Sequence, residues 1–302
     1  MKNIHILYIA AAVLALTTAC KEHYTTYSDA EYVMFADSIS TNLVQNDGGR
    51  FKVAVASTVA KKYDRTFGVE IVDAGSNAIE GVHYRLLTSS VTIPAGELAT
   101  DVEVEGIYDN IEATDSLGFK LRLVMNEKLK WDLYKDSDMT KVVMYKSCPF
   151  DRNNFTGYAM LSSVFLRDYP GEGNSYQRVV YTEPHPTESD MIIVRSALYN
   201  GYDITLRLHG DDPYKPLITM DKDQVISDEA SVFGQILGDN HILCDDSPYY
   251  ESYFNSCQRF AVLWLHVYVE KLGETIGTVG HFYNILEWIS DEEAERLKGE
   301  GY

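Results

Sequence analysis

The chain has 302 residues, of which 26 are basic and 45 are acidic, with a formal net charge of −19 at pH 7. This acidity argues against nucleic acid and an anionic membrane face as binding partners, because both carry negative charge. The length suits two domains better than one. The 22 tyrosines and only 8 prolines favour strands with wet, half-buried faces over disorder.

Residues 1–19 have the composition of a secretory signal peptide. Lys2 supplies a basic start, and residues 4–16 form an apolar segment too short to span a bilayer comfortably. Small residues at 17–19 then precede Cys20. This pattern resembles a bacterial lipobox, with the leucine four rather than three positions before the cysteine. The resemblance implies cleavage before Cys20 and acylation of its sulfur. The alternative is an ordinary secretory signal that leaves Cys20 free.

Lys21 and Glu22 follow this cysteine. A basic residue followed by an acidic one resembles the surface-export signal of Bacteroidetes lipoproteins. It implies an outer-membrane, lipid-anchored protein that faces the cell exterior, with residues 20–31 as the lipidated tether. A lipoprotein facing the periplasm is the alternative.

Residues 32–126 contain short segments of alternating polarity separated by turns, of which Phe51–Val55 and Gly118–Leu123 are clear examples. Such spacing predicts an immunoglobulin-like β-sandwich. Three segments, residues 78–84, 91–97 and 102–107, resemble the Calx-beta domain. The resemblance implies a sandwich fold, in which Tyr84 fills the core end and Gly96 forms a turn that Cβ would forbid.

Calx-beta domains of calcium transporters bind Ca²⁺ through clustered acids. The corresponding residues here are Asp109, Glu112 and Asp115, with Asn110 where the family has a second aspartate. Because Ca²⁺ takes six to eight oxygen ligands, we expect a solvated acidic loop here and no metal site.

Residues 127–148 are expected to form a charged connector, followed by a second domain over residues 149–302. The second domain contains further strand patterns and is predicted to be a second β-sandwich or a lipocalin-like barrel. Ser290 and the acidic residues after it predict a short terminal helix. The layout of lipobox, Calx-beta-like sandwich and C-terminal β domain of unknown function resembles accessory lipoproteins of starch-utilisation-system-like (Sus-like) uptake pairs. The resemblance implies a transporter pair as a partner.

Phe260–Glu270 is the most informative predicted strand. One face is aliphatic and is expected to lie in the core, whereas the other carries Trp264 and further aromatic residues. That second face predicts either a platform for a sugar or an apolar ligand, or a second buried layer. The neighbouring loop adds the candidate ligand-binding residues Tyr249, Tyr250, Tyr253 and Phe254, whose rings either bind a ligand or fold onto the domain wall.

The four cysteines are Cys20, Cys148, Cys244 and Cys257. If Cys20 is lipidated, at least one of the other three is unpaired. Cys244 and Cys257 are close enough in sequence to close a short disulfide loop, and the alternative is that all three are buried thiols. Ser38 and Ser116 each follow an aspartate and precede an apolar residue, which matches the O-glycosylation motif of exported Bacteroidetes proteins.

The sequence contains none of the common motifs of hydrolases, nucleotide-binding proteins or zinc peptidases. We therefore expect no enzyme activity and no cofactor. The favoured hypothesis is an accessory protein that captures a nutrient (a glycan, a peptide or an apolar ligand) beside an outer-membrane uptake system. The alternative is a structural or adhesive lipoprotein that offers only protein–protein surfaces. Convergence of Tyr249, Tyr250, Tyr253 and Trp264 on one exposed concavity would favour capture, whereas scattered or buried rings would favour the alternative.

Overall fold

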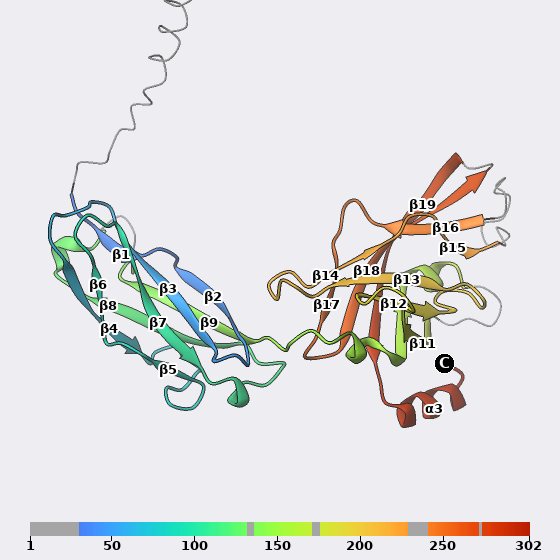
Figure 1. Cartoon of the computed structure of the whole chain (residues 1–302), viewed down its shortest axis with the longest axis horizontal. Helices are drawn as coiled ribbons and strands as arrows, with labels where there is room; N and C mark the ends of the chain where they lie inside the picture. The colour runs from blue at the N-terminus through green and yellow to red at the C-terminus, as the bar shows by residue number, and fades with distance from the viewer. Residues whose placement is uncertain (1–29, 132–135, 171–175, 229–240, 272–273) are drawn as a thin grey trace, which may run out of the picture.

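The computed structural model describes residues 30–131, 136–170, 176–228, 241–271 and 274–302. These residues form two β domains joined by a short connector (Figure 1). The expected all-β class is confirmed, and the C-terminal domain is a barrel rather than a second sandwich. The predicted signal peptide and Cys20 lie outside the described residues. None of the helices within the described residues is long and apolar enough to cross a membrane.

The N-terminal domain is a sandwich of two sheets that bury a shared core. One sheet has the strand order β1 (Val33–Phe35), β3 (Arg50–Ser57), β7 (Ala99–Gly106), β5 (Tyr84–Leu86). The other has the order β2 (Ile39–Val44), β9 (Met139–Lys146), β8 (Leu117–Val124), β4 (Arg65–Val72), β6 (Ser90–Ile93). Two short 3₁₀ helices lie in the connecting loops, η1 (Tyr108–Asn110) and η2 (Glu127–Leu129).

The core of the sandwich follows from strict alternation along the strands, with apolar side chains directed inwards at every second residue. Tyr84 is 1% exposed, and its ring stacks on that of Phe119 at a centroid distance of 3.7 Å. Gly96 has φ +85°, and its N–H donates to the Lys61 carbonyl at 2.7 Å. Both roles expected for Tyr84 and Gly96 are confirmed.

The boundary between the domains differs from the prediction. The apolar segment inside the expected connector, 127–148, is strand β9, which pairs antiparallel with β8 and parallel with β2. The sandwich therefore continues to Lys146, and the true connector begins at Ser147. The parallel pairing of β2 and β9 joins segments about a hundred residues apart, so local patterning at 127–148 could not indicate it.

Among the described residues, eight antiparallel strands close into a barrel in the C-terminal domain. The ring order is β10 (Gly157–Ser163), β11 (Gln177–Pro184), β12 (Met191–Arg195), β13 (Ile204–His209), β14 (Leu217–Met220), β17 (Ser252–Asn255), β18 (Phe260–Lys271) and β19 (Glu274–Trp288). β19 pairs with both β10 and β18, which closes the ring. β16 (His241–Asp246) adds to the far half of β18, and β15 (Gln224–Ser227) adds to β16.

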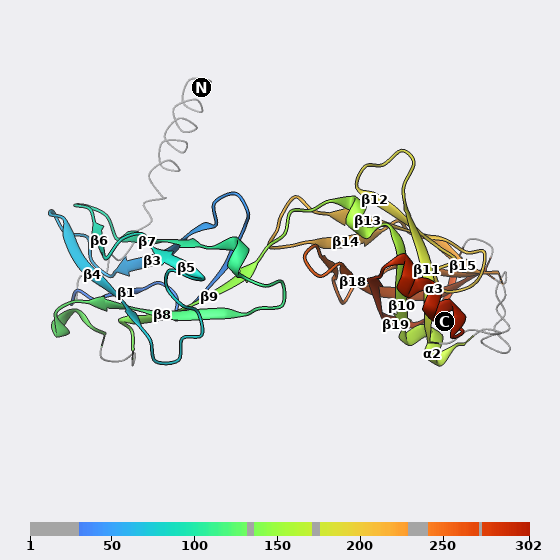
Figure 2. The ribbon, with the colours of Figure 1, turned by 90° about the horizontal axis from the view of Figure 1, so that it is seen from below.

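Helices complete the barrel domain. η3 (Arg152–Phe155) precedes β10, and α2 (Val164–Asp168) packs on β19 through Phe165, whose ring lies 5.1 Å from that of Phe282. The predicted terminal helix is confirmed as α3 (Asp291–Gly299), which lies beside β10 and β11 (Figure 2). The Ser290 hydroxyl accepts the Glu293 N–H at 3.2 Å and so caps its first turn.

Candidate functional site

The outer faces of β18 and β19 carry a row of aromatic rings. Trp264 is paired with Tyr283, and His266 with His281. Residues paired across antiparallel strands project to the same face, so these four half-buried rings share one side of the sheet. The ring centroids are 5.1 Å apart in the first pair and 4.8 Å apart in the second.

The loop between β16 and β17 adds two exposed tyrosines to this row. The Tyr250 ring stacks on Trp264 with centroids 4.2 Å apart and an interplanar angle of 25°, and its side chain is 52% exposed. Tyr249, which is 74% exposed, meets the His281 ring edge-on at 4.9 Å. The Tyr249 N–H donates to the Ser247 hydroxyl at 3.3 Å, which fixes the start of the loop.

Tyr253 extends the row along β17, with its ring 6.4 Å from that of Phe260. We call this whole surface the aromatic face. It consists of Tyr249, Tyr250, Tyr253, Phe260, Trp264, His266, His281 and Tyr283.

Four of the five candidates, Tyr249, Tyr250, Tyr253 and Trp264, therefore gather on one partly exposed face. None of the four lines either of the two cavities described below. The four rings therefore converge on one partly exposed face, but this face is not one of the two cavities.

Phe254 is not part of this surface, so the expected grouping with the three tyrosines is wrong for this residue; its ring lies in the barrel core and borders the pocket between the domains described below. It is 1% exposed and its ring lies 5.1 Å from Phe155 inside the barrel. Successive strand residues point to opposite sides, so Tyr253 and Phe254 cannot both face solvent. Within the run of aromatic residues, the loop ends and β17 begins at Ser252.

Two imidazoles give the aromatic face a polar centre. His266 Nδ1 lies 2.8 Å from Asp245 Oδ1, and its Nε2 lies 3.1 Å from the Thr278 hydroxyl. His281 Nδ1 lies 3.1 Å from the Ser247 hydroxyl. Burial, followed by the neighbouring His266 ring, lowers the pKa of His281 below its ordinary value. The stacked pair is thus held by hydrogen bonds on both members.

His281 and Tyr283 were missed by the sequence reasoning, although a signal existed. His281, Tyr283 and Glu287 lie at alternate positions of the last strand pattern, and this strand follows 260–270 closely enough to form a hairpin. Hairpin pairing would have placed these residues beside Trp264 and His266.

Among the residues that the structure describes, side chains fill the barrel interior. Ala261, Leu263, Leu265 and Val267 project inwards and are at most 1% exposed. A cavity of about 10 Å³, which is space for about one water molecule, lies beside Leu263, Leu265 and Asn284. Eight strands enclose a space that side chains can just fill. The described interior is therefore a packed core, and the aromatic face lies on its outside.

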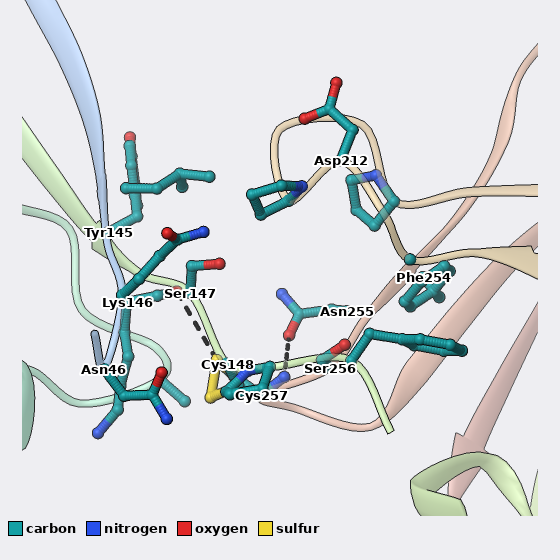
Figure 3. Close-up of a pocket in the computed structure, with 18 of the residues that line it drawn as sticks. Asn46, Tyr145, Lys146, Ser147, Cys148, Asp212, Phe254, Asn255, Ser256 and Cys257 are labelled. Carbon is teal, nitrogen blue, oxygen red and sulfur yellow. Dashed lines mark hydrogen bonds between the residues drawn. A yellow bond between two sulfur atoms is a disulfide. The ribbon is translucent and has the colours of Figure 1, made fainter. Parts of the chain in front are cut away.

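A much larger pocket, of about 450 Å³, lies between the two domains (Figure 3). Its walls come from the end of β2 and the β2–β3 turn, from Ala113 before β8, from the end of β9 with the connector, from the β13–β14 loop, and from the end of β17 with the turn after it. No sequence signal pointed to it, because it is assembled from five segments that are far apart in the chain.

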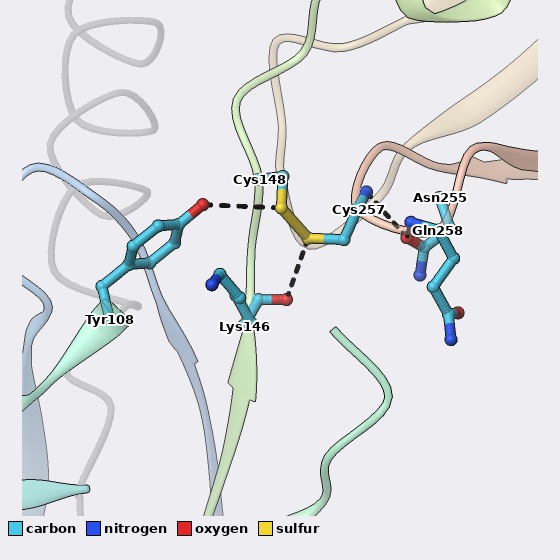
Figure 4. The surroundings of a disulfide bond; sticks show 6 residues. All are labelled: Tyr108, Lys146, Cys148, Asn255, Cys257 and Gln258. Carbon is cyan, nitrogen blue, oxygen red and sulfur yellow. Dashed lines mark hydrogen bonds between the residues drawn. A yellow bond between two sulfur atoms is a disulfide. The ribbon is translucent and has the colours of Figure 1, made fainter. Parts of the chain in front are cut away.

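A disulfide between Cys148 and Cys257 borders this pocket and corrects the pairing expected for Cys244 with Cys257 (Figure 4). Cys244 is a free thiol on β16, fully buried in the barrel core, and burial raises its pKa. Cys257 lies in the turn between β17 and β18, where it meets the connector. Cys244 and Cys257 are close in sequence, but Cys244 lies in the core on β16 whereas Cys257 lies in a turn beside the connector.

The remaining candidates have simple surroundings. Ser38 and Ser116 are both exposed and accessible to modification. In the acidic loop, Asp115 accepts the Glu112 N–H at 3.1 Å, and the Asn110 amide donates to the Val82 carbonyl at 2.7 Å. Within the described residues, no three His, Cys, Asp or Glu side chains are grouped so as to hold a metal ion.

Comparison with solved structures finds low-identity likenesses to β proteins. The apo form of the Calx CBD1 domain is 18% identical, with 39% of this chain and 98% of that chain covered and a TM-score of 0.32. A Bacteroides ovatus protein of unknown function is 9% identical, with 86% and 95% covered and a TM-score of 0.36. A Bacteroides ovatus protein provisionally described as carbohydrate-binding is 13% identical, with 83% and 74% covered and a TM-score of 0.31.

None of the curated proteins matches the chain. A family model described as a domain of unknown function (DUF4984) matches residues 134–300, which is more than half of the sequence. The match contains the whole barrel, the connector and strand β9. The protein therefore belongs to the DUF4984 family.

Proposed function

We propose that this protein is a lipid-anchored accessory protein of the cell envelope that captures glycan chains on its aromatic face, beside an outer-membrane uptake system. The observation that carries the glycan-binding part is the stacking of exposed Tyr250 on Trp264. The envelope address and the transporter partner rest on the N-terminal sequence and on the layout of the chain.

The Tyr250–Trp264 stack suits a sugar ring. One face of the Tyr250 ring is supported by the indole, and the side chain is still 52% exposed. Sugar rings carry an apolar C–H face that packs on an aromatic ring by dispersion and by burial of apolar area. Because Trp264 already holds Tyr250 in place, little side-chain entropy is lost when a ligand binds.

The surroundings of the stack favour a glycan over an apolar ligand. Tyr249, Tyr250 and Tyr253 are all more than 40% exposed, so their hydroxyl groups are accessible to solvent and to a hydroxylated ligand. An apolar ligand would instead require an enclosed cavity, and the barrel interior offers only about 10 Å³.

Affinity electrophoresis through gels that contain soluble starch, β-glucan, xylan, mannan or pectin tests this proposal. The parent protein should be retarded by at least one of these glycans. Tyr250→Ala should weaken that retardation at least about tenfold, which corresponds to about 1.4 kcal/mol of binding free energy. The matched control is Tyr181→Ala on β11, which removes a tyrosine that is 45% exposed and lies outside the aromatic face.

Two results would contradict the proposal. If Tyr250→Ala and Tyr181→Ala migrate alike in a retarding gel, the aromatic face does not bind the glycan. If none of the five glycans retards the parent, glycan capture is wrong and the structural or adhesive alternative takes its place. Melting curves of both variants separate lost binding from lost fold, because substitutions of exposed residues cost about 0.5 kcal/mol or less.

A further inference from the structure

The pocket between the domains has the size and location of a small-molecule site. Its volume is about 450 Å³, within the range of about 300–1,000 Å³ found for ligand pockets. Such sites often lie where domains meet. It shares no residue with the aromatic face, although both use β17, since Tyr253 belongs to the face whereas Asn255 lines the pocket.

The walls of the pocket are tied together by contacts on both sides of the connector. The Cys148–Cys257 disulfide joins the connector to the barrel (Figure 4). The Tyr108 hydroxyl of the sandwich lies 3.5 Å from Cys148 Sγ. The Leu43 N–H of β2 lies 3.5 Å from the Tyr214 hydroxyl of the β13–β14 loop. A pocket whose walls are already held in place loses less entropy when a ligand binds.

Neutral polar groups point into this space. The side-chain oxygen of Asn255, Oδ1, accepts the backbone N–H groups of Cys257 and Gln258, each at 2.9 Å. These two bonds leave the Asn255 NH₂ group to point toward the opening, where the Ser147 hydroxyl faces it (Figure 3). The pair offers donors and an acceptor to a ligand that carries hydroxyl groups.

Apolar surface complements these polar groups. Phe150 lines the pocket together with three prolines at 149, 213 and 216. A Cβ on Gly210 would come within 2.2 Å of the Phe150 ring, so only glycine allows the β13–β14 loop to pack against this ring. The pocket thus combines rigid apolar walls with a few polar groups that can orient a ligand.

Charge excludes one class of ligand. Asp47, Asp211 and Asp212 line the pocket, whereas the only basic side chain among its lining residues is Lys146. The Lys146 ammonium lies 4.3 Å above the Tyr108 ring. Anionic ligands such as phosphates would be repelled by this excess of carboxylates.

We infer that the pocket between the domains is a second binding site, which takes a neutral polyhydroxylated ligand of the size of a mono- or disaccharide. Ser147 and Asn255 hydrogen-bond the ligand, and the Phe150 side packs against its apolar face. This site is independent of the aromatic face, and the two are distinguished by separate variants.

The test is calorimetric titration of the purified protein with glucose, galactose, mannose, xylose, maltose and cellobiose. At least one of these sugars should bind the parent. Asn255→Asp keeps an oxygen to accept the two turn N–H groups but replaces the inward NH₂ donor, and should weaken binding at least tenfold. Gln258→Glu makes the same amide-to-acid change on an exposed residue of the same turn that does not line the pocket, and should bind as the parent does.

Comparison of the variants shows which of the two sites binds the short sugars. Short-sugar binding that survives in Tyr250→Ala but is lost in Asn255→Asp supports the pocket. Binding that is lost in Tyr250→Ala and retained in Asn255→Asp places the sugar on the aromatic face and overturns the inference. Equal loss in Asn255→Asp and Gln258→Glu, or no binding of any of the six sugars, also overturns it. Binding of the diamine putrescine in place of these sugars would assign the pocket to cations and contradict a neutral ligand.

Discussion

Tyr253 and Phe254 are neighbours in β17, yet their side chains have opposite surroundings. Tyr253 is 42% exposed on the aromatic face, whereas Phe254 is 1% exposed in the barrel core. Aromatic composition marked both as candidates, but a strand sends alternate side chains to opposite sides. Telling the exposed ring from the buried one required knowing that β17 begins at Ser252. A run rich in tyrosine does not show where the loop ends and the strand begins.

Phe254→Ala should therefore destabilise the protein, and Tyr253→Ala should not. Truncating a buried phenylalanine costs about 3–5 kcal/mol through lost burial and a residual cavity. Truncating an exposed tyrosine costs about 0.5 kcal/mol or less. Urea unfolding of the two variants measures both values. Equal destabilisation would mean that Tyr253 is also a packing residue and would remove it from the aromatic face.

The stacked histidines predict a pH dependence of stability. The pKa of His281 is lowered in the folded protein, so the folded state binds its proton less readily than the unfolded state. This contribution to stability is fully present above the unfolded pKa of about 6.5 and is lost as the pH falls through the lower folded value.

The free energy of unfolding should accordingly fall between pH 7.5 and pH 5.5, and fall less in His281→Gln than in the parent. His241→Gln, which changes an exposed histidine at the start of β16, is the control and should follow the parent. A parent-like pH profile for His281→Gln would show that the folded environment does not favour the neutral imidazole.

At the scale of elements, β18 was predicted well because its pattern is long and alternates cleanly. Its aliphatic face is buried in the barrel, as expected, whereas the other face is more varied. Trp264 and His266 are half-buried, and Tyr268 is only 3% exposed, with its hydroxyl 2.6 Å from Asp223. The outer face of β18 is thus half-buried at Trp264 and His266 and buried at Tyr268, whose hydroxyl donates to Asp223 in the turn before β15.

The disulfide links two elements that are 109 residues apart in sequence. Closing a loop of about 100 residues lowers the entropy of the unfolded chain and so stabilises the folded protein. The chain-entropy model gives a stabilisation of up to about 4.7 kcal/mol, and typical measured values are about 2–4 kcal/mol. The double substitution Cys148→Ser and Cys257→Ser should lower the melting temperature of the barrel domain.

Two measurements check this prediction. Calorimetry of the double variant should show the barrel transition shifted and the sandwich transition unchanged. Peptide mapping of the unreduced parent should recover a peptide that contains both Cys148 and Cys257, and a thiol reagent should leave native Cys244 unmodified because it is buried. A cross-linked peptide containing Cys244 would contradict the structure.

At the scale of the whole molecule, the two domains meet at a short connector, and the chain as a whole is predicted to be held at the membrane by acylated Cys20. Acyl chains contribute about 0.8 kcal/mol for each buried CH₂ group, so more than one chain gives stable anchoring. Cys20→Ala should move the protein from the membrane fraction to the soluble fraction.

Fractionation of cells that express each form measures this shift, with Cys244→Ala as the cysteine control that should stay with the membranes. Sedimentation of Cys20→Ala with the membranes would refute the lipoprotein prediction. It would leave the two binding proposals standing, since neither depends on how the protein is held.

By itself, the sequence determined the all-β class, the sandwich with Tyr84 in its core, the capped terminal helix and the two faces of β18. These features depend on strand alternation, turn conformation and helix capping, and each of these effects is set by residues that are neighbours in the chain. Only the tertiary structure decided that β9 completes the sandwich, that β19 closes the barrel, that Cys148 pairs with Cys257, and that a pocket lies between the domains. Each of these joins segments distant in sequence, and their pairing depends on how whole strands pack, a property that no local pattern contains.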